Sequence, residues 1–179
     1  MYNNRNEIKE PVHSITLDIV DQLKLKNFIK KALFIKNKEY HHIIDSNQEE
    51  KRWFTGIGAE LAVEKFLGKK FVDLTVGLSN NYNKADLKKL DLKIGVKCTE
   101  YGKYHIIFKD SKEPEIIVFR DNNRFDILGL ATVEVLNTYQ NSDLILSPNL
   151  RARGIKTGFF GYKYLKPFKN LKELKGLIE

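Results

Sequence analysis

Cysteine is almost absent from this sequence, and Cys98 is its single occurrence. One cysteine cannot form an internal disulfide, which predicts a protein of a reducing compartment, the cytoplasm. A single cysteine can be a nucleophile. Cys98 lies within an apolar strand pattern, however, and is expected to be a small packing residue.

Long apolar runs are also missing. No stretch approaches the roughly 20 residues that a membrane-spanning helix needs, and the N-terminal sequence MYNNRNEIKE lacks the apolar core of a signal peptide. We find no internal repeat, low-complexity segment or interdomain linker. For 179 residues, these absences predict one domain over residues 1–179 with no membrane partner, and a flexible polar segment at residues 1–12.

Acidic residues are outnumbered by basic ones. The chain has 23 Asp and Glu against 31 Lys and Arg, which gives a net charge of +8. This excess favours a polyanionic partner, nucleic acid before anionic membrane, although a general bias toward lysine explains it as well. No helix-turn-helix, zinc-finger or RRM signature is present, so no known module for reading a nucleotide sequence is indicated.

Hydrophobic periodicity predicts an α/β fold in which a central mixed β-sheet is flanked by helices. Helices are expected over 19–35, 46–67 and 167–178, with a short one near 133–139. The expected strands are 71–76, 84–87, 92–99, 104–109, 115–119 and 125–132. In this arrangement Asp86 and Lys97 lie on neighbouring strands that a short polar turn connects.

Three residues of these elements suggest a catalytic site. Glu60 lies in a row of the 46–67 helix that should face the sheet, and a buried carboxylate is costly unless it is paired or binds a metal. Asp86 and Lys97 place a carboxylate beside an amine, an arrangement that can hold a divalent cation next to a phosphate and a water molecule. Structural roles stay open: a salt bridge for Glu60, a turn or cap for Asp86, and a solvent-reaching lysine for Lys97.

The order of these motifs resembles that of the PD-(D/E)xK nuclease superfamily, and of its small phage-encoded members in particular. The resemblance covers roughly residues 53–132 and rests on Gly56 to Glu60, on Asp86, on Val96-Lys97 and on Ile127-Leu128-Gly129. It implies a restriction-endonuclease-like fold and a metal-dependent DNA endonuclease, acting in the host cytoplasm if phage-encoded. Asp86 and Glu60 would hold Mg²⁺ or Mn²⁺, and Lys97 would orient or deprotonate the attacking water. Products would carry 5′-phosphate and 3′-hydroxyl ends, and a homodimer would suit enzymes of this class.

The sequence departs from the superfamily pattern at Gly95, which stands where an Asp or Glu normally precedes the lysine by two residues. Three outcomes are open. Glu60 could supply the missing ligand. Asp91 could also do so, because in a strand its side chain lies on the same face as those of positions 95 and 97, whereas the side chain of Glu100 lies on the opposite face. Alternatively the site is inactive, and the fold serves as a nucleic-acid-binding or protein-inhibitor module.

The C-terminal segment 149–179 has eight basic residues against two acidic ones. Arg151, Arg153 and Lys156 are the predicted contacts to nucleic-acid backbone phosphates, because nearby glycines let backbone amides approach. The segment also contains four aromatic residues: Phe159, Phe160, Tyr162 and Tyr164. They are expected to alternate into the core as a last strand, and stacking on the bases of a single strand is the alternative.

Overall fold

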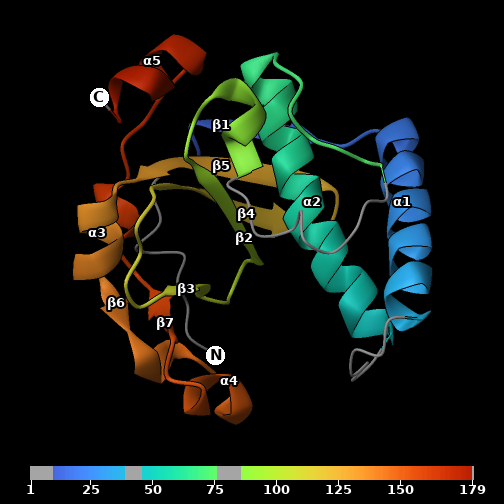
Figure 1. Ribbon diagram of the computed structural model, residues 1–179. Helices are drawn as coiled ribbons and strands as arrows, with labels where there is room; N and C mark the ends of the chain where they lie inside the picture. Colours follow the sequence, from blue (N-terminus) through green and yellow to red (C-terminus); the bar gives the residue numbers. More distant parts are fainter. Residues whose placement is uncertain (1–9, 39–45, 76–85, 179) are drawn as a thin grey trace.

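The computed structural model describes residues 10–38, 46–75 and 86–178, and Figure 1 shows how their helices and strands are arranged. Four of the described strands form a mixed sheet in the order β1-β5-β4-β2. In it β2 runs parallel to β4, whereas β4 and β5, and β5 and β1, are antiparallel. The bounds of these strands are β1 His13–Thr16, β2 Gly95–Glu100, β4 Glu115–Asp121 and β5 Arg124–Ala131. The α/β architecture with a mixed, helix-flanked sheet is therefore confirmed.

The long helix α2 (Ser46–Leu67) packs on one face of this sheet, and the second long helix, α1 (Ile19–Lys38), packs against α2 (Figure 1). The larger apolar core lies between them and the sheet, and it includes Phe54, Val96 and Ile116. Asp18 caps α1, since its carboxylate accepts a hydrogen bond of 2.9 Å from the amide of Asp21. Gly68 ends α2 at a φ of 63°, a conformation that glycine adopts without strain.

A second, three-stranded sheet faces the other side, in the order β3-β7-β6. A smaller apolar core separates it from the first sheet and includes Ile117, Phe119 and Tyr162. Its strands and the remaining short elements are β3 His105–Phe108, α3 Val133–Thr138, β6 Gln140–Asn141, η4 Ser142–Leu144, α4 Pro148–Ala152, β7 Lys156–Phe159, η5 Tyr162–Tyr164 and α5 Leu171–Gly176.

Two predicted strands are wrong. Residues 71–75 have no regular structure, and position 76 lies outside the described residues. Asp86 begins the 3-10 helix η3 (Asp86–Leu90), in which Leu87 is fully buried, and the predicted strand residues before it are not described. Of the predicted flexible segment 1–12, residues 1–9 are not described, whereas the amide of Val12 donates to Ile127 O at 2.7 Å. No helix in the described part is long and apolar enough to cross a membrane.

Two glycines of α2 provide a test of this packing. A Cβ added at Gly58 would lie 2.6 Å from Cζ of the fully buried Phe125, whereas one added at Gly56 would meet nothing within 4 Å. We expect Gly58→Ala to lower the free energy of unfolding by about 1–3 kcal/mol through overpacking. Gly56→Ala should raise it by about 0.5–1 kcal/mol, because alanine loses less backbone entropy in a helix. Urea denaturation measures both changes, and equal effects of the two variants would contradict this packing.

Candidate functional site

Asp86 lies at the free edge of the four-stranded sheet. β2 is the edge strand, and the amide of Val96 donates a 2.5 Å hydrogen bond to Asp86 Oδ2. The amide of Leu87 donates to Ile94 O at 3.1 Å, so η3 is fastened to the entry of β2. Asp86 thus lies beside the strand of Lys97, as the sequence indicated, although a 3-10 turn and not a strand holds it there.

Glu115 is the carboxylate that sequence reasoning missed. It begins β4 and pairs with Gly95 in the parallel register of β2 and β4. A Cβ built on Gly95 would lie 3.7 Å from Asp86 Oδ2, 3.6 Å from Glu115 Cγ and 3.9 Å from Glu115 Cδ. The space left by the missing side chain at position 95 is therefore bordered by two carboxylates, one from η3 and one from β4.

Lys97 faces the same space. Its Nζ lies 3.7 Å from Glu115 Oε1, and about a third of its side chain remains accessible to solvent. The other carboxylate oxygen, Glu115 Oε2, is buried without a hydrogen-bond partner. A buried oxygen left unsatisfied is costly, so groups of this kind call for an explanation such as an ion or water. The site therefore combines a lysine beside one oxygen of Glu115 with a second, buried oxygen that has no hydrogen-bond partner.

Glu60 completes the cluster from α2. Burial raises the pKa of Glu60 to about 8; the charge of Asp86 adds to this increase and that of Lys97 opposes it. The structure therefore brings the three sequence-predicted groups, Glu60, Asp86 and Lys97, into mutual electrostatic interaction. The raised pKa favours the protonated form of Glu60, which can donate a proton. To bind a metal, Glu60 would first have to lose this proton.

The two acids beside Gly95 also have perturbed pKa values. Burial raises the pKa of Glu115 to about 7, with Lys97 opposing and Asp86 adding to the increase. Burial raises the pKa of Asp86 too, while its hydrogen bond from Val96 and the charge of Lys97 oppose the increase. Clusters of acids that penalise one another's charge are typical of metal and catalytic sites, although structural networks produce them as well.

The residues present fit a hard divalent cation. Mg²⁺ is usually held by one or two carboxylates, with water and substrate phosphate oxygens filling its octahedron. Asp86 and Glu115 provide such a pair, and the unpartnered Oε2 of Glu115 is a free ligand atom. Within the described residues, no group of three or more His, Cys, Asp or Glu side chains is placed to hold a metal. Two carboxylates alone would leave most positions of an octahedral cation to water or to other oxygen ligands.

The predicted phosphate-binding residues have different surroundings. Lys156 lies on β7, with its Nζ 3.0 Å from the ring centroid of Phe108, and burial lowers its pKa to about 8 with a further contribution from the charge of Lys97. Lys156 thus belongs to the surroundings of Lys97. Arg151 donates to Asp143 O at 3.1 Å and Ile145 O at 2.7 Å, which is a structural role, whereas Arg153 is exposed.

Other sequence candidates lie outside the cluster. Asp91, considered as a substitute ligand, is exposed on a turn at a φ of 58°. Glu100 forms ion pairs with Lys51 at 2.7 Å and Lys103 at 2.8 Å. Burial raises the pKa of the Cys98 thiol, so this residue is a packing group and not a thiolate nucleophile.

A buried histidine, His105, contacts β4, the strand that pairs with the strand of Lys97. His105 Nε2 lies 2.8 Å from Val118 O and its Nδ1 lies 3.2 Å from the Tyr162 hydroxyl, an arrangement that the neutral ring satisfies. Burial lowers the pKa of His105 to about 4.

Acid should therefore destabilise the protein through His105. An unfolded histidine binds a proton near pH 6.5 and the folded one only near pH 4, so the contribution of His105 is complete above pH 6.5 and is lost as the pH falls to 4. We expect the wild type to lose about 3 kcal/mol more unfolding free energy between pH 7 and pH 4 than His105→Gln. Denaturant titrations at both pH values measure the difference, and parallel pH profiles would rule out a buried neutral histidine.

Comparison with known proteins adds no assignment to this geometry. The chain matches no protein-family model, and no curated protein or solved structure shows significant similarity to it.

Proposed function

We propose that this protein is a metal-dependent nuclease that hydrolyses phosphodiester bonds, with DNA as the expected substrate and a restriction-endonuclease-like core. The observation that carries the proposal is the pair of carboxylates around Gly95, with Lys97 against one of them. The superfamily pattern that the sequence resembles normally has an acid at position 95. Here Glu115, an acid of the neighbouring strand β4, borders the same space.

Each group in this proposal has a role that its position allows. Asp86 and Glu115 would hold the cation, which would supply charge neutralisation and an activated water when bound. Lys97, partly exposed at the mouth of the cluster, contacts the phosphate and orients the attacking water. Glu60, protonated at neutral pH and next to Asp86, is placed to donate a proton or to join the ligands after losing it.

The sharpest first test is a pair of Asp-to-Asn changes. Asp86→Asn keeps an oxygen that can accept from Val96 but removes the charge, and cleavage of plasmid DNA with Mg²⁺ or Mn²⁺ should fall about a hundredfold or more. The matched control is Asp91→Asn, since asparagine tolerates the positive φ of this exposed turn. The control should cleave like the wild type. Equal activity of the two variants would exclude Asp86 from the chemistry.

A second candidate function is a nuclease-like fold that binds nucleic acid without cleaving it. Gly95 favours this alternative, because it removes the customary strand acid. The same assay separates the two functions. Retardation of DNA by the wild type without cleavage at any Mg²⁺ or Mn²⁺ concentration supports the binder, and cleavage that depends on Asp86 supports the enzyme.

A further inference from the structure

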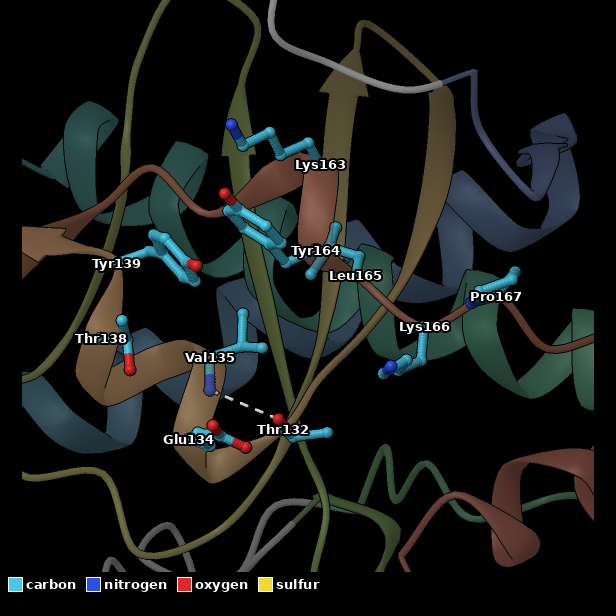
Figure 2. Close-up of a pocket in the computed structure, with 10 residues that line it drawn as sticks. All are labelled: Thr132, Glu134, Val135, Thr138, Tyr139, Lys163, Tyr164, Leu165, Lys166 and Pro167. Carbon is cyan, nitrogen blue, oxygen red and sulfur yellow. Dashed lines mark hydrogen bonds between the residues drawn. The ribbon is translucent and has the colours of Figure 1, made fainter.

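A hollow of about 550 Å³ lies between α3 and the segment from Lys163 to Pro167 (Figure 2). Its lining includes Thr132, Tyr139, Lys163, Tyr164 and Lys166. A volume of this size is in the range of small-ligand sites. Glu134 is the only acid of the lining, and Figure 2 shows it at the end of the hollow far from Lys163.

The walls of this hollow are held in place by the sheet. Lys166 exchanges two backbone hydrogen bonds of 2.9 Å with Leu130 of β5. The close approach depends on Gly129, where a Cβ would lie 2.7 Å from Lys166 O. On the opposite wall, Thr132 Oγ1 accepts a 3.3 Å hydrogen bond from Val135 at the start of α3 (Figure 2). A ligand would therefore meet a shaped surface rather than a mobile loop.

The four aromatic residues of the C-terminal segment differ in their exposure to solvent, and Tyr164 is the one that lines the hollow. Phe159 and Tyr162 are fully buried, whereas Phe160 is 38% and Tyr164 37% exposed. Tyr164 stacks on Tyr139 with ring centroids 4.0 Å apart and planes 15° apart. The sequence left two roles open for these aromatics, and the structure divides them: two residues fill the core and two remain available at the surface.

A cation already lies over this aromatic pair. Lys163 Nζ is 4.9 Å from the Tyr164 ring centroid, on an exposed side chain. A lysine over an exposed ring is weakly held, and a nucleobase stacks on such a ring more strongly. An entering base can take the place of the ammonium group, which then lies within reach of the phosphate attached to that base.

We propose that this hollow binds a single strand of nucleic acid, with a base on Tyr164 and backbone phosphates on Lys163 and Lys166. A duplex is a poorer occupant, because its bases are already stacked on each other and expose no face to the tyrosine. A polynucleotide fits better than a free nucleotide, because exposed lysines continue from the hollow at every third position, namely Lys166, Lys169, Lys172 and Lys175.

The position of the hollow connects it to the carboxylate cluster. Thr132 follows Ala131, which is the register partner of Glu115 across β4 and β5. Neighbouring strands are about 4.8 Å apart, so the lining residue Thr132 lies near the start of β4, where Glu115 stands. Use of the hollow to guide substrate toward Glu115 rests on the proposed nuclease function, whereas the binding site itself does not.

Binding is measured by fluorescence polarisation with a labelled oligonucleotide of about 15 nucleotides, single-stranded or annealed. EDTA is present throughout, so that cleavage cannot contribute. We expect the full chain to bind the single strand more tightly than the duplex. Tyr164→Ala should weaken single-strand binding about tenfold, and Tyr164→Phe, which keeps the ring, should stay within about twofold of the wild type.

Lysine variants test the phosphate contacts. Lys163→Ala should weaken binding and reduce the slope of log affinity against log salt by about 0.7, the value for one phosphate contact on a single strand. Lys30→Ala, an exposed lysine of α1 across the sheet, should change neither quantity. Unchanged binding by Tyr164→Ala with an intact thermal transition, equal affinity for duplex, or no binding at all would each overturn the proposal.

The two proposals fail separately. Asp86→Asn tests the cleavage site and Tyr164→Ala tests the hollow, since Tyr164 lines the hollow and Asp86 does not. Loss of cleavage with retained binding leaves the hollow proposal standing. Cleavage of duplex DNA by a protein that does not recognise single strands would overturn the hollow proposal and support the nuclease alone.

Discussion

Moving a carboxylate from position 115 to position 95 is expected to restore much of the cleavage activity that is lost when the carboxylate is simply removed. Glu115→Ala should lower the rate by about 10²–10³-fold, because a lost ligand costs several kcal/mol of charge stabilisation in the transition state. In the double variant Gly95→Asp with Glu115→Ala, the acid returns to the same space from β2. The new Cβ has ordinary contact distances of 3.6–3.9 Å in the present structure, so the backbone can accept it.

The relocation is measured as initial rates of plasmid nicking at saturating Mg²⁺. We expect the double variant to recover at least tenfold over Glu115→Ala. Gly95→Ala with Glu115→Ala is the matched control, because it adds the Cβ without the acid, and it should remain inactive. Full activity of Glu115→Ala would contradict the role of Glu115, and a double variant no better than its control would contradict the shared position.

Neutralising Glu115 is expected to stabilise the folded protein at alkaline pH. The folded-state pKa of Glu115 is raised from 4.5 to about 7. An acid shifted upward holds its proton more tightly when folded, so its contribution is complete below pH 4.5 and is lost as the pH rises to 7. At pH 8 the wild type should therefore be less stable than Glu115→Gln by up to about 3 kcal/mol. Lys97 loses an ion pair in this variant, but its partial exposure keeps that cost small.

The control for this effect is Asp91→Asn, at an exposed turn residue outside the cluster. It should change the free energy of unfolding by less than about 0.5 kcal/mol at any pH. Thermal or urea unfolding at pH 5 and pH 8 gives the comparison, with little gain expected for Glu115→Gln at pH 5. If Glu115→Gln were destabilising at pH 8, Glu115 would be a structural ion-pair partner of Lys97 rather than a group placed there for function.

Local signals in the sequence predicted α2 with its observed bounds. A periodic apolar pattern and the glycine that follows it, Gly68, predict that helix without reference to distant residues, and Gly68 has a φ of 63° in the structure. For α1 the sequence pattern does not decide which side chains are buried. Ile19 and Leu23 are 66% and 53% exposed, while Leu25 and Ile29 are fully buried. Helical spacing allows more than one row, and only the packing partner, here mainly α2, decides which row is covered.

The candidate site shows the same limit. Asp86, Lys97 and Glu60 could be selected because their residue types and order along the chain carry information. Glu115 could not, since a glutamate at the start of an apolar strand has the ordinary pattern of a solvent-exposed strand end. Its role depends on the parallel pairing of β2 with β4, which brings Glu115 beside Gly95. A glycine at a position that normally bears an acid is the one signal that could have prompted a search for a substitute.

Direct measurement of Mn²⁺ binding tests the central claim that Asp86 and Glu115 hold a divalent cation at Gly95. Titration calorimetry at pH 7.5 should show one Mn²⁺ per chain for the wild type, with heats lost in Asp86→Asn and in Glu115→Gln. The heats should return in the double variant Gly95→Asp with Glu115→Ala. Equal Mn²⁺ binding by the wild type and by both single variants would contradict the account.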